Sequence, residues 1–394
     1  MDHLKNISER RVERVSLDFT RFLYHEIDWS QRLIVVLGQR GTGKTTMLLQ
    51  RMKEETEKSV YVSMDDIYFE SNRLIKWIDV MVEEGYRVFY VDEVHRYLHW
   101  SKDLKSAYDN YPDIRIIITG SSILDVSKGQ ADLSRRAVIY QLPGLSLREF
   151  IELENDKKFE SVPLDQMLQN HIDIGSHITG LLDISKVFKN YLKYGYYPFF
   201  MEGKKVYPQK LRELANLVLD VDIAPFEELN FKTVRNMKKL IYVISQSVPF
   251  KPNISKLSKK MDIPRNTILK MLDLLDRATI LQLLRSDTKG VSYLQKPDKI
   301  YMGNPNLAYV MAEEKPNVGN LRETFFLNQV MNKHNVHASR FADFIVDRTY
   351  TFEIGGPSKT NEQIRDIPNA FIAADGIEGG GGNKIPLWLF GFLY

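Results

Sequence analysis

The stretch Arg32-Leu-Ile-Val-Val-Leu-Gly-Gln-Arg-Gly-Thr-Gly-Lys-Thr-Thr46 runs from an apolar, strand-like segment through a glycine-rich turn into a helical pattern. Its centre, Gly38 to Thr45, reads G-x-x-x-x-G-K-T. Glycines let the backbone aim several N–H groups at phosphate oxygens, and a helix beginning near Lys44 directs its positive dipole end to the same place. The pattern predicts a nucleoside triphosphate site. The residues expected to contact the nucleotide are Gly38, Gln39, Arg40, Gly41, Thr42, Gly43, Lys44, Thr45 and Thr46.

Two side chains of this loop have distinct expected roles. Lys44 is expected to reach the outer phosphates, and the Thr45 hydroxyl to ligate Mg²⁺. A second apolar run, Val88-Phe-Tyr-Val-Asp-Glu93, ends in two carboxylates that would emerge beside the loop in a parallel sheet. We expect Asp92 to hold the metal ion and Glu93 to act as general base on the attacking water. The alternative is an ordinary strand whose acidic end caps the following helix.

A third strand-like run, Ile114 to Thr119, is followed by Gly120-Ser121-Ser122. Short polar groups at this place would lie near the γ-phosphate and the attacking water, so Ser121 is the candidate sensor. A Gly-Ser turn before a helix, with Ser122 as its cap, explains the same residues equally well.

Together, these motifs resemble the AAA-type ATPases. The following Asp132-Leu-Ser-Arg-Arg-Ala137, Val138 to Leu142 and Leu145-Ser-Leu-Arg-Glu-Phe150 resemble the bacterial and archaeal branch that carries a C-terminal domain of unknown function. The resemblance implies ATP and Mg²⁺ as ligands. It also implies that the strand ending at Thr119 separates the Asp92 strand from the phosphate-loop strand. In that family an arginine near the end of the core can act as a finger on nucleotide charge, which would make Arg135 or Arg136 catalytic. The alternative for both is a solvated basic turn.

Composition agrees with a multidomain globular protein. The 394 residues are 43% hydrophobic and 27% charged, and the formal net charge is +3. That balance gives no global attraction to nucleic acid or to acidic membranes. The chain has no cysteine, which excludes disulfides and thiolate metal sites. The N-terminus lacks the apolar core of a signal peptide, and the apolar end, Ile385 to Tyr394, is too short to span a bilayer. We therefore expect a cytoplasmic protein without a membrane partner, whose last residues are buried.

The fold class expected is α/β, with a P-loop parallel sheet covered by helices on both faces and followed by helical and α+β parts. The predicted divisions are an N-terminal helical segment (1–30), the ATPase core (31–145), a helical region (146–245), a winged-helix-like domain (246–312) and a nuclease-like C-terminal domain (313–394).

Within the helical region, Tyr191-Leu-Lys-Tyr-Gly-Tyr-Tyr-Pro-Phe-Phe200 is dense in aromatic residues. It resembles the family's Tyr-Gly-x-Tyr-Pro signature. A turn fixed by glycine and proline and packed into a core is favoured over a ligand platform.

Asn253 to Ala278 reads as helix, short turn, helix. The strand-like runs Ile280 to Leu284 and Val291 to Leu294 would supply a wing. The second helix mixes cationic residues with Asp273 and Asp276, so DNA binding and protein docking are equally favoured, and plain structural packing is a third option.

The last segment carries dispersed acidic residues. Glu323 lies in a helical run, and Asp343 and Glu353 lie in strand-like runs. This order resembles the restriction-endonuclease-like fold, in which clustered carboxylates hold magnesium and a lysine follows the last acid by two positions. Gly355 occupies that lysine position, and Lys359 is the nearest substitute. A degenerate, interaction-only domain is favoured over an active nuclease, and an unrelated fold is the remaining alternative.

The residues thus predict an ATP-binding and ATP-hydrolysing protein that couples nucleotide state to a DNA- or protein-interacting C-terminal half. Oligomerisation is compatible with these motifs. A non-hydrolysing nucleotide-gated module and an ATP-regulated nuclease are the alternatives.

Overall fold

The computed structural model describes residues 1–121, 135–224, 229–246, 252–287, 296–312 and 316–394. The chain divides into two compact units, Met1–Pro143 and Gly144–Tyr394.

Unit 1 is built on a five-stranded sheet in which every neighbouring pair is parallel. The strands are β1 (Leu33–Gly38), β2 (Ser59–Ser63), β3 (Val88–Asp92), β4 (Arg115–Ser121) and β5 (Val138–Gln141). Their order is β2-β3-β4-β1-β5. β4 therefore lies between the phosphate-loop strand and the Asp92 strand, which confirms the order that the resemblance implied.

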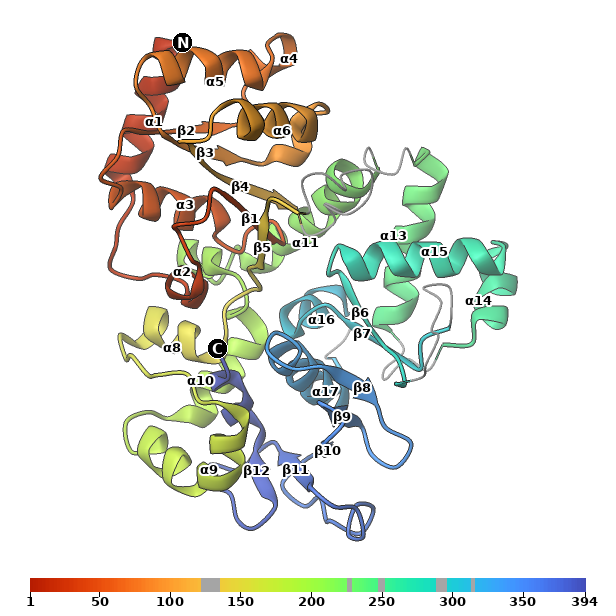
Figure 1. The fold of residues 1–394 in the computed structure, drawn as a ribbon. Coiled ribbons are helices and arrows are strands. Elements are labelled where there is room, and N and C mark those ends of the chain that lie inside the picture. Colours follow the sequence, from red (N-terminus) through yellow and green to blue (C-terminus); the bar gives the residue numbers. More distant parts are fainter. Residues whose placement is uncertain (122–134, 225–228, 247–251, 288–295, 313–315) are drawn as a thin grey trace. The chain divides into compact units, whose positions relative to one another are not determined.

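Helices cover both faces of this sheet (Figure 1). They are α1 (Asp2–Arg14), α2 (Phe22–Glu26), α3 (Lys44–Lys53), α4 (Tyr68–Ser71), α5 (Leu74–Glu83), the 3-10 turn η1 (Val94–Arg96) and α6 (Trp100–Asn110). Alternate residues of β1 enter two separate cores, because successive strand side chains point to opposite faces. Val35 packs with Trp77 of α5, whereas Val36 packs with Leu48 of α3. The predicted parallel sheet with helices on both faces is confirmed.

Unit 2 begins with helices. They are α8 (Leu147–Asn155), α9 (Leu164–Thr179), α10 (Ile184–Tyr194), the 3-10 turn η2 (Pro198–Glu202), α11 (Tyr207–Leu217), the π-helical turn η3 (Val218–Ile223) and α13 (Phe231–Ser245). The aromatic segment between α10 and η2 is core: Tyr191, Tyr197 and Phe200 are buried. The buried Asn306 amide donates to the Tyr191 carbonyl oxygen at 2.9 Å, and its oxygen accepts from the Tyr196 N–H at 2.9 Å. The prediction of a packed turn is therefore confirmed.

A helical pair and a two-stranded antiparallel sheet follow. Their bounds are α14 (Ile254–Met261), α15 (Arg265–Arg277), β6 (Leu281–Leu284), β7 (Lys299–Met302) and then α16 (Pro305–Met311). Among the described residues, the strand that pairs with β6 is β7. The predicted run Val291 to Leu294 lies outside the described residues. Buried Tyr301 and Met302 explain this pairing, because β7 has a core face.

The C-terminal part combines one long helix with a mixed sheet. Its elements are α17 (Val318–Val330), β8 (Val336–Ala338), β9 (Phe344–Val346), β10 (Tyr350–Gly355), β11 (Ala370–Ala374), β12 (Lys384–Pro386) and the 3-10 turn η4 (Leu387–Phe392). The strand order is β12-β11-β10-β9-β8. β10, β11 and β12 are parallel, and β9 is antiparallel to both of its neighbours.

The apolar C-terminus is buried as predicted, with Tyr394 only 1% exposed. Its carbonyl oxygen accepts a hydrogen bond from Arg148 Nε at 2.9 Å. Among the helices that the structure describes, none combines the length and the apolar character needed to cross a bilayer.

Candidate functional site

The phosphate loop has the backbone that its glycines predict. Gly41 and Gly43 have positive φ angles of 82° and 96°, a conformation that residues with a Cβ rarely adopt. α3 begins at the next residue, Lys44, so the N–H groups of its first turn lie at the loop. Lys44 is only 4% exposed, and its Nζ donates to the carbonyl oxygens of Gly38 and Gln39, both at 2.9 Å. The loop is thus a cationic cradle suited to phosphate.

A residue that sequence reasoning missed supports this loop from the N-terminal side. The buried Arg21 guanidinium donates from Nη1 to the Thr42 carbonyl oxygen and from Nη2 to the Pro143 carbonyl oxygen at 2.9 Å. The Thr42 hydroxyl donates to the Gln39 carbonyl oxygen at 2.8 Å. These bonds fix the loop between the segment before α2 and Pro143, two residues after the end of β5.

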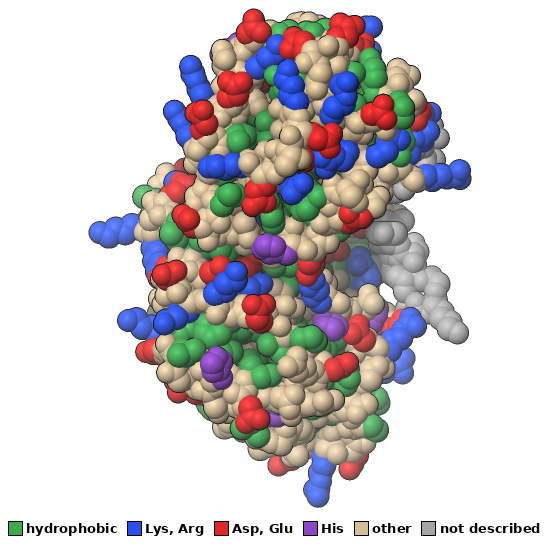
Figure 2. Space-filling view, turned by 60° about the vertical axis from the view of Figure 1, so that its left-hand side comes forward, with side chains coloured by type: hydrophobic (Ala, Val, Ile, Leu, Met, Phe, Trp, Pro, Cys, Tyr) green, Lys and Arg blue, Asp and Glu red, His purple; other side chains and the backbone are tan. Residues whose placement is uncertain are grey.

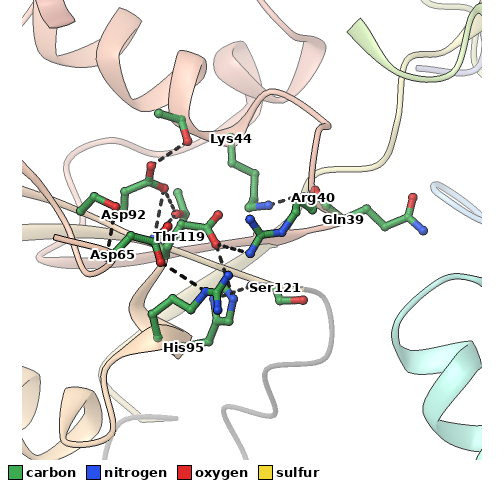
Figure 3. Close-up of polar contacts among 12 residues, drawn as sticks. Gln39, Arg40, Lys44, Asp65, Asp92, His95, Thr119 and Ser121 are labelled. Carbon is green, nitrogen blue, oxygen red and sulfur yellow. Dashed lines mark hydrogen bonds and ion pairs between the residues drawn. The ribbon is translucent and has the colours of Figure 1, made fainter. Parts of the chain in front are cut away.

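Asp92, at the end of β3, accepts hydrogen bonds from side chains of β2, β4 and the first turn of α3 (Figure 3). Its Oδ2 accepts from the Thr45 hydroxyl at 2.6 Å and from the Tyr61 hydroxyl at 2.8 Å. Its Oδ1 accepts from the Thr119 hydroxyl. Burial, reinforced by the Asp92 charge, raises the pKa of Tyr61 well above its usual range, so Tyr61 stays a donor. The predicted pair of magnesium ligands, Thr45 and Asp92, is therefore in direct contact.

Glu93 follows with an unusual backbone. Its φ of 53° lies in the left-handed region, a conformation that costs on the order of 1–3 kcal/mol and is concentrated at functional sites. Its N–H donates to Thr119 Oγ1 at 3.0 Å and to Asp92 Oδ1 at 3.2 Å. These two bonds hold the peptide in that conformation and set the direction of the carboxylate.

The Glu93 carboxylate lies between two cationic or potentially cationic side chains. Arg40 Nη2 of the phosphate loop and His95 Nε2 are each 3.4 Å from Glu93 Oε2. His95 Nδ1 accepts from the Ser121 N–H at 3.3 Å. Because Nδ1 accepts this bond, Nε2 is the ring nitrogen that faces Glu93 as a donor. This chain of contacts joins the loop, the carboxylate and the end of β4, and His95 was not anticipated from the sequence.

The structure places the remaining catalytic candidates of unit 1 as follows. Ser121 is buried at the end of β4 and pairs in register with Gly38. Arg136 forms an ion pair with Asp109 of α6, with Nε 3.0 Å from Oδ1, and Arg135 is exposed. Ser122 and Asp132 lie outside the described residues.

The two helices α14 and α15 carry an uneven charge distribution. Exposed cationic side chains are Lys256, Lys259, Lys260, Arg265 and Lys270. Asp276 accepts from the Leu283 N–H at 2.9 Å, which joins α15 to β6. Burial raises the pKa of Asp276 to about 6. It is therefore a structural acid, and it detracts less from the cationic surface than the sequence suggested. Across the coloured face in Figure 2, by contrast, acidic and basic side chains are interspersed.

Two lysines pair with the three acids of the C-terminal part. Lys299 Nζ of β7 is 2.7 Å from Asp343 Oδ1 and 3.0 Å from Glu323 Oε2. Lys359 Nζ is 2.5 Å from Glu353 Oε1. Burial, with the nearby Asp343 charge, raises the pKa values of both Glu323 and Glu353. The sequence resemblance gave no indication of Lys299, because β7 precedes the segment that carries the acidic pattern.

Gly355 explains how Lys359 reaches Glu353. A Cβ at position 355 would lie 2.6 Å from Lys359 Cβ and 2.7 Å from its Cγ. The Lys359 stem thus occupies the space in which a side chain at 355 would begin.

Comparisons with known proteins identify families that match parts of this chain. Residues 30–151 match the family described as an AAA domain, and residues 185–317 match a domain of unknown function, DUF8612. The chain is 27% identical over 268 residues to an uncharacterized protein of Methanocaldococcus jannaschii. That match covers 64% of this chain and 56% of the relative, so the chain spans little more than half of the relative's length.

Two solved structures show weaker similarity. One is the RuvB Holliday junction branch migration motor of Thermotoga maritima, at 16% identity, covering 70% of this chain and 94% of that one with a TM-score of 0.35. The other is the ORC1 protein of Aeropyrum pernix in complex with DNA, at 12% identity, covering 78% and 92% with a TM-score of 0.32. The domain assignment rests on the family match and on the strand order, not on these low scores.

Proposed function

We propose that residues 30–151, which match the AAA domain family, bind and hydrolyse ATP and couple the nucleotide state to the C-terminal half. The observation that carries the proposal is the Thr45–Asp92 hydrogen bond at 2.6 Å, with Glu93 as the next residue. A hydroxyl and a carboxylate beside a phosphate cradle are oxygen donors of the kind that Mg²⁺ uses together with nucleotide phosphates and water. Bound there with ATP, Mg²⁺ would neutralise phosphate charge.

The chain's own groups have separate roles in this proposal. Lys44 exchanges its carbonyl partners, Gly38 and Gln39, for phosphate oxygens. Glu93 accepts the proton of the attacking water, and its backbone bonds to Asp92 and Thr119 aim the carboxylate. Ser121, at the end of β4, is proposed as the group that senses the γ-phosphate.

Arg40 and His95 are proposed as positioning residues for Glu93. Both lie 3.4 Å from the carboxylate oxygen Oε2. An arginine finger from Arg135 or Arg136 would act on nucleotide charge. Because Arg135 is exposed, it has the freedom to act on the nucleotide of a neighbouring copy in an oligomer.

Calorimetric ATP titration with Mg²⁺ tests the site. Lys44→Ala is expected to abolish binding, and Lys76→Ala, at a side chain 79% exposed on α5, is the matched control. Glu93→Gln is expected to bind ATP but to lose turnover, with exposed Glu70→Gln as its control. Wild-type turnover by Glu93→Gln would remove Glu93 from its proposed role. Absence of turnover in the wild type as well would favour the non-hydrolysing alternative.

For the C-terminal half, we propose that α14 and α15 form a winged-helix-like unit with the antiparallel strands β6 and β7, and that its cationic side chains contact DNA. Lysines that neutralise phosphates contribute a salt-dependent affinity, with a slope of about 0.9 per contact. Lys259→Gln with Lys260→Gln is expected to weaken duplex binding and to reduce the salt slope. The control is Lys76→Gln with Lys102→Gln on unit 1. Equal binding by both double variants would favour a protein partner.

A further inference from the structure

The carboxylates of the C-terminal cluster come from three elements that are distant in sequence. Glu323 lies on α17, Asp343 precedes β9, and Glu353 lies on β10. Each is largely withdrawn from water, with exposed side-chain fractions of 13%, 17% and 6%. Several like charges at such a place need a cation, because unpaired buried charge is strongly unfavourable.

The cation between the first two acids is an ammonium group of the chain itself. Lys299 Nζ lies 2.7 Å from Asp343 and 3.0 Å from Glu323. These are hydrogen-bond lengths for an ammonium, whereas Mg²⁺ binds oxygen at about 2.0–2.1 Å. Although burial opposes its charge, the two carboxylates raise the pKa of Lys299, so it is held protonated. The distances between these groups therefore suit an ammonium better than a small divalent ion.

Neighbouring groups fix this arrangement. The Tyr301 hydroxyl donates to Glu323 Oε2 at 2.6 Å, the same oxygen that Lys299 contacts. The Ile354 N–H donates to Asp343 Oδ2 at 3.0 Å, which leaves Oδ1 to Lys299. Lys299 and Tyr301 both come from β7, so β7 supplies two donors to the acids of the C-terminal part.

The third acid is different. Glu353 Oε1 pairs with Lys359 at 2.5 Å, but Oε2 is buried and has no hydrogen-bond partner within the described part of the chain. Among the residues that the structure describes, no three acidic or histidine side chains converge on a metal position. The cluster thus supplies carboxylate oxygens, which are the ligands that Ca²⁺ and Mg²⁺ prefer, and one of these oxygens is unsatisfied. Lys299 lies between two of the three acids.

We propose that Lys299 is the resident cation of this cluster. Its ammonium group takes the place of a divalent ion and joins β7 to α17 and to Asp343, the residue before β9. Removal of this ammonium group exposes a latent cation site. The carboxylates then serve to join β7 to the C-terminal sheet, in place of metal-dependent chemistry. The inference does not depend on ATP hydrolysis by unit 1.

Calcium ion alone is the probe, because Ca–O distances of about 2.3–2.6 Å come nearest to the observed spacing. Titration calorimetry of the full chain without nucleotide compares the wild type, Lys299→Met and Lys299→Arg. Lys299→Met is expected to bind one more equivalent of Ca²⁺ than the wild type. Lys299→Arg, which keeps the charge, is expected to bind no more than the wild type. Glu353→Gln added to Lys299→Met is expected to remove the extra equivalent. Calcium sites elsewhere in the chain are present in all variants, so they do not affect the difference in the number of bound ions.

Thermal unfolding gives a second readout. Lys299→Met is expected to unfold at a lower temperature than Lys299→Arg, and Ca²⁺ is expected to restore part of the loss. Lys299→Met without added Ca²⁺ binding would overturn the proposal. If Lys299→Met does not fold, Ca²⁺ binding by the wild type is compared with binding by Glu353→Gln. Equal binding by the two supports the proposal, because Lys299 then already fills the site. Ca²⁺ binding by the wild type that is lost in Glu353→Gln overturns the proposal.

Discussion

The Thr45 hydroxyl donates a 2.6 Å hydrogen bond to Asp92 Oδ2, joining the first turn of α3 to the end of β3. These residues are 47 positions apart, and the parallel order of β1, β4 and β3 brings them together. The contact gives the phosphate loop an acidic partner at the place where a metal–triphosphate would bind.

Removal of the Thr45 hydroxyl tests this contact. Thr45→Ala is expected to reduce kcat/KM for Mg²⁺–ATP by about 10²-fold or more, because the metal loses one ligand and Asp92 loses a donor. Thr45→Ser keeps the hydroxyl and is expected to stay within about tenfold of wild type. Equal loss in both variants would show that the methyl group, not the hydroxyl, matters.

Arg21 is expected to be required for a rigid loop. Arg21→Met leaves the carbonyl oxygens of Thr42 and Pro143 without this donor, and hydrogen bonds to charged groups contribute about 1.5–3 kcal/mol each. We expect a lower unfolding free energy of unit 1 and at least about tenfold weaker ATP binding. Exposed Arg14→Met is the control, and denaturant unfolding with ATP titration measures both effects. Unchanged ATP affinity in Arg21→Met would contradict this role.

Gly355 is expected to tolerate no side chain. Gly355→Ala forces Lys359 away from Glu353 and is expected to destabilise unit 2 by about 1–3 kcal/mol. Gly379→Ala, where an added Cβ meets nothing within 4 Å, is the control. Urea unfolding of the two variants compares them. A neutral Gly355→Ala would show that the Lys359 stem is free to move.

Asp276 is expected to make stability depend on pH. Burial raises its pKa from 3.8 to about 6, and Arg285 and Asp273 are the charged groups that act on it. A raised acid pKa favours the protonated form in the folded state. Its contribution is therefore fully present below about pH 4 and is lost as pH rises through about 6. The unfolding free energy of wild type relative to Asp276→Asn is expected to fall between pH 4.5 and pH 7.5. An equal difference at both pH values would contradict the assignment.

Much of unit 1 could be predicted from sequence because its signals are local. A strand followed by G-x-x-x-x-G-K-T and a helix can be recognised without knowledge of distant residues. The Asp92–Glu93 pair can likewise be recognised from the apolar run that precedes it. The burial of the aromatic segment around Tyr197 could also be predicted, since its glycine and proline fix a turn. An isolated arginine among apolar residues at position 21 was the available signal for loop support.

The other partners depend on tertiary packing. Tyr61 and His95 reach the site only because β2 and η1 lie beside the ends of β3 and β4. Lys299 carries no motif, and its role follows from the pairing of β7 with β6 and the position of α17. The predicted strand Val291 to Leu294 lies outside the described residues. The β6 partner that the structure describes is β7, whose core face packs against the rest of unit 2.

Steady-state phosphate release by the wild-type chain, measured with ATP in the presence of Mg²⁺ and again with excess chelator, tests the central claim most directly. The arrangement of Lys44, Thr45, Asp92 and Glu93 predicts sustained release that requires Mg²⁺ and disappears in Glu93→Gln. ATP bound tightly with no release under any condition, or release that Glu93→Gln leaves unchanged, would contradict it.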